Sequence, residues 1–97
     1  MNPRDPSHFV VLNFALETSD DGPPRQRTRS CGAFAAIEAA FDAAREEAGR
    51  ELLWRRANPQ AGAVELLDTE WGYDLRQGFL VISRYWVHDH TPSVLTL

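Results

Sequence analysis

One segment of the chain carries a long amphipathic helical pattern, and stretches typical of β-strands lie on both sides of it. Between residues 33 and 57, apolar residues recur at intervals of three and four from Phe34 to Leu52, which places them on one face of a helix. Alanine favours helix throughout this segment, and Asn58-Pro59 ends it. Because a lone amphipathic helix must bury its apolar face against another layer, the flanking strands are expected to form a sheet against which it packs.

The strand-like stretches predict two β-hairpins. The first strand is apolar on both faces, as interior strands are, whereas its partner is short, polar and charged, as edge strands often are. A dense cluster of turn-forming residues separates the two. In chain order, the expected segments are a strand at 8–17, a turn at 18–24, a strand at 25–31, the helix at 33–57, a strand at 63–73, a turn at 74–78 and a strand at 79–88.

The expected fold class is therefore α+β, with hairpin–helix–hairpin (ββαββ) order and one long helix packed on one face of an antiparallel sheet. The 97 residues fit a single small domain over 1–97, with 1–7 and 91–97 expected to be mobile tails. The most apolar strands, at 9–16 and 79–88, are expected at the centre of the sheet.

Composition excludes several classes of function. All 10 basic residues are arginine, so the chain has no lysine for a Schiff base or a phosphate-binding loop, and the lone Cys31 leaves no internal disulfide and no cysteine-built zinc site. No apolar run is long enough to span a membrane, and a reducing cytoplasm is the expected location. The formal net charge is −4, and residues 58–97 carry two arginines against five acids. This balance opposes nucleic-acid binding and favours a partner with a basic surface.

One face of the last predicted strand carries the strongest functional signal. Alternation places Trp86 and Arg84 beside Leu80 and Ile82 on the face away from the helix, while Phe79, Val81, Ser83, Tyr85 and Val87 form the helix-packing face. Tryptophan and arginine are enriched at the energetic centres of protein interfaces. The outer face must meet either water or a partner, so we predict that Trp86 and Arg84 contact a partner protein.

The second hairpin adds acidic and aromatic candidates for the same surface. Two readings of its acidic residues stay open: a solvated edge, or a surface that steers a basic partner. The aromatic residues around Gly72 serve either as binding anchors or as cover for the end of the helix. The partner-binding candidates added here are Trp71, Tyr73, Glu70, Asp68 and Asp74.

Two other patterns support an alternative, nucleic-acid or metal-binding function. Arg25, Arg27 and Arg29 alternate on one side of their strand, where guanidinium groups can grip phosphates, but arginines also solvate an edge strand. His88 and His90 share a strand face, as two ligands of one metal ion would, yet no third histidine or cysteine follows at a ligand spacing. No metal site, cofactor or catalytic residue is therefore predicted.

The leading hypothesis is a small, acidic, non-enzymatic protein-binding module that inhibits a partner by occupying its basic surface. In size, acidity and element order the chain is similar to small phage-encoded inhibitors such as anti-CRISPR proteins, and to some bacterial immunity proteins. That likeness implies a phage anti-defence or immunity-type inhibitor, and it assigns no residue a role because no motif carries it. The alternative is a self-associating structural protein, since a one-sided sheet can bury its open face against a second copy as a dimer.

Overall fold

The computed structural model describes residues 8–19, 22–58 and 63–90, and its element order is ββαβββ. The first hairpin consists of β1 (Phe9–Ser19) and β2 (Gly22–Phe34), and the helix α1 (Ile37–Arg56) follows it. Three more strands complete the fold: β3 (Glu65–Thr69), β4 (Gly72–Gln77) and β5 (Leu80–Asp89). The expected tails at 1–7 and 91–97 lie outside the described residues.

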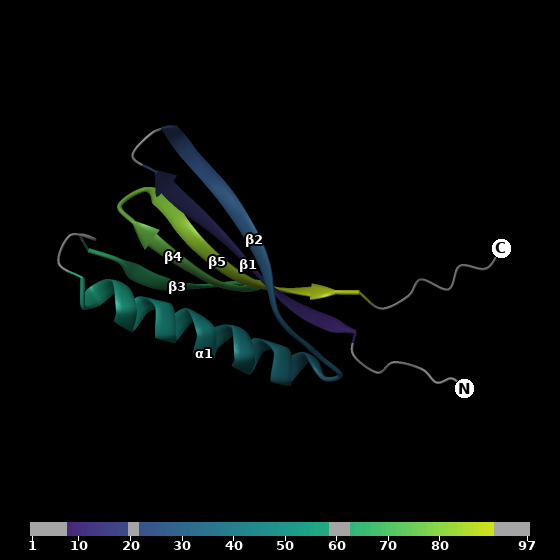
Figure 1. Cartoon of the computed structure of the whole chain (residues 1–97). Helices are drawn as coiled ribbons and strands as arrows, with labels where there is room; N and C mark the ends of the chain where they lie inside the picture. Colours follow the sequence, from purple (N-terminus) through teal and green to yellow (C-terminus); the bar gives the residue numbers. More distant parts are fainter. Residues whose placement is uncertain (1–7, 20–21, 59–62, 91–97) are drawn as a thin grey trace.

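The strands form one antiparallel sheet in the order β2-β1-β5-β4-β3. Helix α1 lies across one face of this sheet, and no element of the described ranges covers the other face (Figure 1). The predicted α+β class, with one long helix on one face of an antiparallel sheet, is confirmed, and β5 and β1 occupy the central region as predicted. Among the described residues, no helix combines the length and apolar character needed to cross a membrane.

Small side chains let α1 lie close to the sheet. Ala40, Ala44 and Ala48 recur every four residues and are fully buried. Since an alanine methyl reaches no further than Cβ, the helix backbone itself approaches the strands. The residues that complete this core are Val11 of β1, Val64 before β3, Leu75 of β4, and Ile82, Tyr85 and Val87 of β5.

The helix begins at Ile37 rather than at residue 33. Phe34, which the periodicity assigned to the apolar helix face, instead ends β2, where it pairs with Phe9 and packs against the same core. An apolar residue three positions before Ile37 suits a helix face and a strand end equally well. Periodicity alone could not distinguish them.

The C-terminal region contains one more strand than predicted. The turn predicted at 74–78 was wrong: the chain turns at Glu70-Trp71 and again at Gly78-Phe79, and 72–77 pairs on both sides as β4. The polar composition of this segment favours a turn when the segment is considered alone. Pairing with β3 and β5, which are other parts of the chain, makes it a strand. The carboxylate of Asp74 also has partners on β5, which are described below.

A β-bulge changes the faces of the first residues of β5. Ile82 and Ser83 together lie opposite Leu75, since the next pair joins Val81 to Arg76. Ile82 consequently belongs to the core and is 7% exposed, although strict alternation predicted it on the outer face. Phe79, predicted on the helix-packing face, lies in a turn and is fully exposed. Beyond the bulge the predicted helix-packing residues are buried, namely Ser83, Tyr85 and Val87.

Candidate functional site

The outer face of the sheet presents a group of half-buried apolar and aromatic side chains. Alternation along β1 and β5 directs them away from Val11 and Tyr85, which are buried under α1. No element of the described ranges covers them, so they keep part of their surface exposed. These residues, here named the outer-face group, are Leu12, Phe14, Trp86 and His88.

Asp74 fixes Trp86 and Arg84 on this face. The indole Nε1 of Trp86 donates a 2.8 Å hydrogen bond to Asp74 Oδ1, and the Arg84 Nε lies 3.3 Å from Oδ2. The second contact is an ion pair without hydrogen-bond geometry. The Arg84 guanidinium also lies over the Trp86 ring, 4.6 Å from its centroid. Three of the predicted partner-binding residues therefore form one cluster, in which the carboxylate of the buried Asp74 orients an indole and a guanidinium.

The other four predicted residues are distributed around this cluster. Glu70 and Trp71 form the turn between β3 and β4, with Trp71 49% exposed and its carbonyl oxygen accepting a hydrogen bond from the Val87 amide. Tyr73 pairs with Tyr85 on the helix side of the sheet and packs against the core. Asp68, opposite Tyr73 on the edge strand β3, is exposed on that same side. Tyr73 and Asp68 are thus not brought together with Trp86.

A buried polar network joins α1 to the sheet, and the sequence analysis did not identify it. The Glu51 carboxylate accepts hydrogen bonds from Ser83 Oγ at 2.7 Å and from Tyr85 Oη at 2.5 Å. Its second oxygen accepts one from Arg55 Nε at 2.5 Å. Asn13 Nδ2 extends the chain of bonds by donating to Ser83 Oγ at 2.9 Å. The network therefore connects β1, β5 and α1 beneath the helix.

The electrostatics of this network keep Glu51 ionised and Tyr85 protonated. Burial alone would raise the pKa of Glu51, but the hydrogen bonds from Tyr85, Ser83 and Arg55 outweigh it and hold that pKa below its ordinary value. Burial raises the pKa of Tyr85, and its hydrogen bond to the Glu51 carboxylate raises it further. Since neither group exchanges protons near neutral pH, the pair suits a structural role better than general acid–base catalysis.

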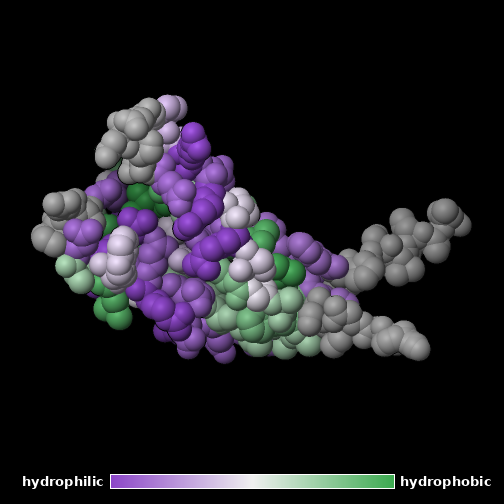
Figure 2. All heavy atoms as spheres, viewed as in Figure 1, coloured by the Kyte–Doolittle hydropathy of each residue, from purple (hydrophilic) through white to green (hydrophobic). Residues whose placement is uncertain are grey.

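An open cleft of about 480 Å³ lies beside the network, between the C-terminal half of α1 and the first hairpin. Its floor is formed by the buried residues Asn13, Ala15 and Tyr85. Figure 2 shows hydrophilic residues over β2 and the C-terminal half of α1, and hydrophobic ones over the N-terminal half of the helix. The walls of the cleft consist of Leu16, Glu17, Arg27 and Arg29 from the hairpin and Glu47, Arg50, Glu51, Trp54 and Arg55 from α1.

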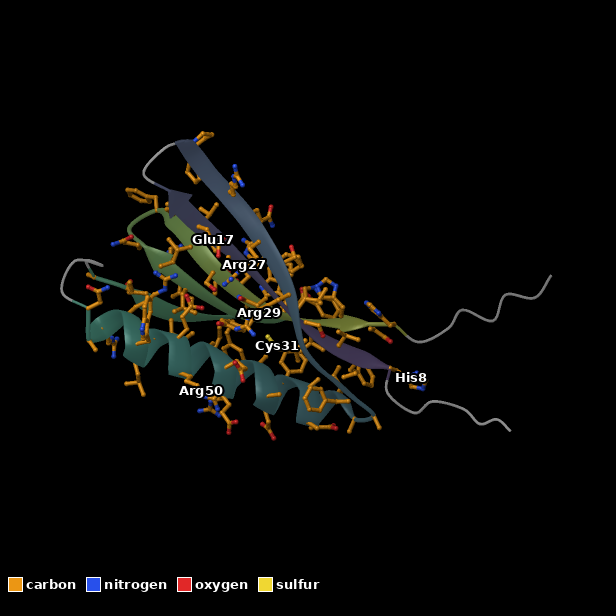
Figure 3. The ribbon with its side chains drawn as sticks, viewed as in Figure 1. His8, Glu17, Arg27, Arg29, Cys31 and Arg50 are labelled. Atoms are coloured by element: carbon orange, nitrogen blue, oxygen red, sulfur yellow. The ribbon has the colours of Figure 1, made fainter. Side chains whose placement is uncertain are left out.

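The alternating arginines of β2 lie on the helix side of the sheet. Arg27 and Arg29 line the cleft, whereas Arg25 lies outside the set of cleft residues. Arg27 forms a 3.0 Å ion pair with Glu17, and no carboxylate of the described residues pairs with Arg29. Figure 3 shows Arg27 and Arg29 following one another along β2 toward α1, which carries Arg50. Two of the three predicted arginines, Arg27 and Arg29, thus line the open cleft, while all three remain exposed to solvent.

The histidines lie near one end of the central strands. The His88 and His90 rings are 6.2 Å apart between centroids, and the His90 amide donates a 2.6 Å hydrogen bond to the His8 carbonyl oxygen. His88 packs edge-on against Phe14. Within residues 8–19, 22–58 and 63–90, no group of three or more histidine, cysteine, aspartate or glutamate side chains is arranged to hold a metal ion.

The sequence did contain a signal for the buried network. Glu51 follows Ala48 by three residues and Ala44 by seven, so helical spacing places this acid on the buried face of α1. Asn13 and Ser83 are likewise polar residues within strands that are otherwise apolar on that face. A charged group on a buried helix face requires hydrogen-bond donors from the opposite layer.

Comparison of the chain with protein-family models, with curated proteins and with solved structures found no match. The functional assignment therefore depends on the geometry of the two surfaces described here, the Asp74–Arg84–Trp86 cluster and the cleft beside α1.

Proposed function

We propose that this chain is a non-enzymatic protein-binding domain that docks a partner protein on the outer face of its sheet and inhibits it by covering a basic surface. The observation that carries the proposal is the Asp74–Arg84–Trp86 cluster at the middle of an uncovered face. Trp86 is held by a hydrogen bond and a cation–π contact before any partner arrives. Preorganised aromatic anchors reduce the entropy lost on binding and often dominate interface energies.

The surroundings of Trp86 resemble the composition of protein interfaces. Leu12 and Phe14 of β1 pair directly with Trp86 and Arg84 of β5, so apolar surface lies next to the cluster. Arg84 keeps 40% of its side chain exposed, which leaves its terminal nitrogens available to a partner's acceptors. Aromatic and apolar side chains at the centre with polar groups at the rim are typical of specific interfaces.

Charge at the β3 edge favours a basic partner. Glu65 and Glu70 are exposed there, and neither forms an ion pair with a cation of the described residues. Such unpaired carboxylates accelerate encounter with a positively charged surface and disfavour an acidic one. We place the domain in a reducing cytoplasm, in keeping with the free thiol of Cys31.

The test begins with the partner captured by the tagged chain from the native host or its phages, which is then purified and titrated against variants. Trp86→Ala should raise the Kd at least about tenfold, as loss of an interface anchor does. Glu70→Arg should raise it several-fold and reduce its dependence on salt, because an attractive charge at the rim is reversed. The matched control is Trp54→Ala, which removes an exposed tryptophan of α1 and should leave the Kd unchanged.

Circular dichroism of each variant checks that the fold persists. Wild-type affinity in both Trp86→Ala and Glu70→Arg would overturn the assignment of this face. A concentration-dependent dimer that Trp86→Ala dissociates, measured by light scattering with no other partner bound, would replace the proposal with self-association through the same face.

A further inference from the structure

The cleft between α1 and the first hairpin has the chemistry of a small-molecule site, independent of the outer face. Its volume of about 480 Å³ falls within the range of roughly 300–1,000 Å³ typical of ligand pockets. A few fixed polar groups line it, since Glu51 holds both Tyr85 at the floor and Arg55 in the wall. The Asp74–Arg84–Trp86 cluster takes no part in it.

Arginines supply the cleft with an anion-binding wall. Arg29 lines it without a carboxylate partner among the described residues, and Arg27 is two positions away on the same strand face. Alternate residues of a strand are about 6.6 Å apart, so one phosphate group can contact both guanidiniums. The Arg27–Glu17 pair is about half exposed at each side chain, and an exposed pair of this kind gives way readily to a stronger anion.

Trp54 supplies the opposite wall with an aromatic surface. It lines the cleft and is 64% exposed, so its ring is accessible to a ligand. The Arg55 guanidinium lies 5.8 Å from its ring centroid, and Arg55 is itself fixed by Glu51. The buried network therefore reaches the tryptophan through one cation–π contact.

The remaining charges limit the size of the anion. Glu47 and Glu51 line the helix wall, opposite the β2 arginines, and both are already paired with arginines of α1. A polyanion that crossed the cleft would meet these carboxylates, and the net charge of −4 would repel it further. A molecule with one phosphate at Arg29 and an uncharged flat ring at Trp54 avoids both costs.

We propose that this cleft binds a phosphate monoester of mononucleotide size that also carries an aromatic ring. Arg29 and Arg27 hold the phosphate, and Trp54 stacks on the ring. Binding involves no covalent step. The proposal goes beyond partner binding on the outer face, and either can fail without the other.

The test is a titration of the full chain with adenosine 5′-monophosphate, adenosine and inorganic phosphate. Calorimetry measures each Kd, and the NMR signals of the Trp54 indole and the Arg29 side chain report whether the ligand contacts them. The nucleotide should bind at least about tenfold more tightly than either fragment, because only it uses both walls. Arg29→Gln and Trp54→Ala should each weaken it about tenfold. The matched controls, Arg25→Gln on the same strand and Trp71→Ala elsewhere on the surface, should change the Kd less than about twofold.

Three results would overturn the proposal. The first is an absence of shifts at Trp54 and Arg29 at millimolar nucleotide. The second is an equal loss of affinity in Arg25→Gln and Arg29→Gln, which would indicate general charge attraction only. The third is a single-stranded RNA that binds far more tightly than the mononucleotide with steep salt dependence, which would make the cleft part of a nucleic-acid surface.

Discussion

Glu51 joins the helix to the sheet by hydrogen bonds, beside the apolar core that Ala40, Ala44 and Ala48 form with the strands. A carboxylate removed from water is costly unless donors replace its hydration. Here Ser83 and Tyr85 from β5 and Arg55 from the next turn of α1 provide those donors. The lowered pKa of Glu51 shows that the donors more than compensate for burial.

We therefore expect Glu51→Gln to reduce the free energy of unfolding by about 1–3 kcal/mol at pH 7, since three donors lose a charged acceptor. The pKa of Glu51 is lower in the folded chain than its ordinary value of 4.5, so its stabilisation is full above that pH. It is lost as the pH falls through the folded pKa. Urea titrations between neutral and acidic pH should show a shallower loss of stability in Glu51→Gln than in the wild type.

The matched control for this measurement is Glu46→Gln, which removes an exposed acid that pairs with Arg50 across one helical turn. Exposed pairs of this kind contribute little, so the change in stability should stay within about 0.5 kcal/mol. Identical acid profiles for wild type and Glu51→Gln would contradict the role given to Glu51.

Within the secondary-structure elements, the space around two glycines differs, because the backbone of β4 lies close to that of β5 at Gly72 while Gly49 of α1 has open space beside it. Gly72 lies opposite Trp86, has φ of +154°, and a Cβ placed on it would meet the Tyr85 carbonyl oxygen and the Trp86 Cα. These are backbone atoms, which cannot move aside without disturbing the pairing of β4 with β5. Gly49, on α1, has no atom within 4 Å of the position a Cβ would take.

Alanine substitutions at these two glycines should therefore change stability in opposite directions. Gly72→Ala should lower the free energy of unfolding by more than about 2 kcal/mol through steric conflict and backbone strain. Gly49→Ala should raise it by about 0.5–1 kcal/mol, because alanine is the better helix former. Chemical denaturation of the two variants measures both values, and a neutral Gly72→Ala would contradict the close approach of β4 to β5.

Periodicity and alternation predicted the elements whose partners are simple. The helix, the first hairpin and the central position of β1 and β5 follow from apolar patterns, because burial on one face is a local property of the sequence. The β4 strand and the bulge at Ile82 did not, since they depend on pairing with residues far along the chain. Likewise, three of the partner-binding candidates converge only because Asp74 contacts Trp86 and Arg84. The cleft required the relative placement of α1 and β2.

At the scale of the whole molecule, packing is uneven across the sheet. β5 and β4 have neighbours on both edges and the helix on one face, whereas the edge strand β2 is exposed from Gly22 to Ser30. The distal part of the β1–β2 hairpin, which forms one wall of the cleft, therefore has the weakest support within the described sheet.

Hydrogen exchange should report this gradient. Amides of β5 and β4 should exchange only with global unfolding, while the distal pairs of β1 with β2, near Glu17 and Arg25, should exchange at least about tenfold faster through local opening. Exchange followed by NMR or mass spectrometry measures each segment. Equal protection across the whole sheet would show instead that the hairpin opens only with the rest of the molecule.

The alanine face of α1 also determines how wide the cleft is. At Ala48 the helix rests on the sheet through a single methyl group, one turn before the Glu51, Trp54 and Arg55 side chains that line the cleft. A valine or leucine at position 48 would lift the C-terminal half of α1 away from β5 and lengthen the hydrogen bonds that reach Glu51. The small side chain of Ala48 thus determines three properties together: the distance between α1 and the sheet, the width of the cleft, and the hydrogen bonds that keep Glu51 ionised.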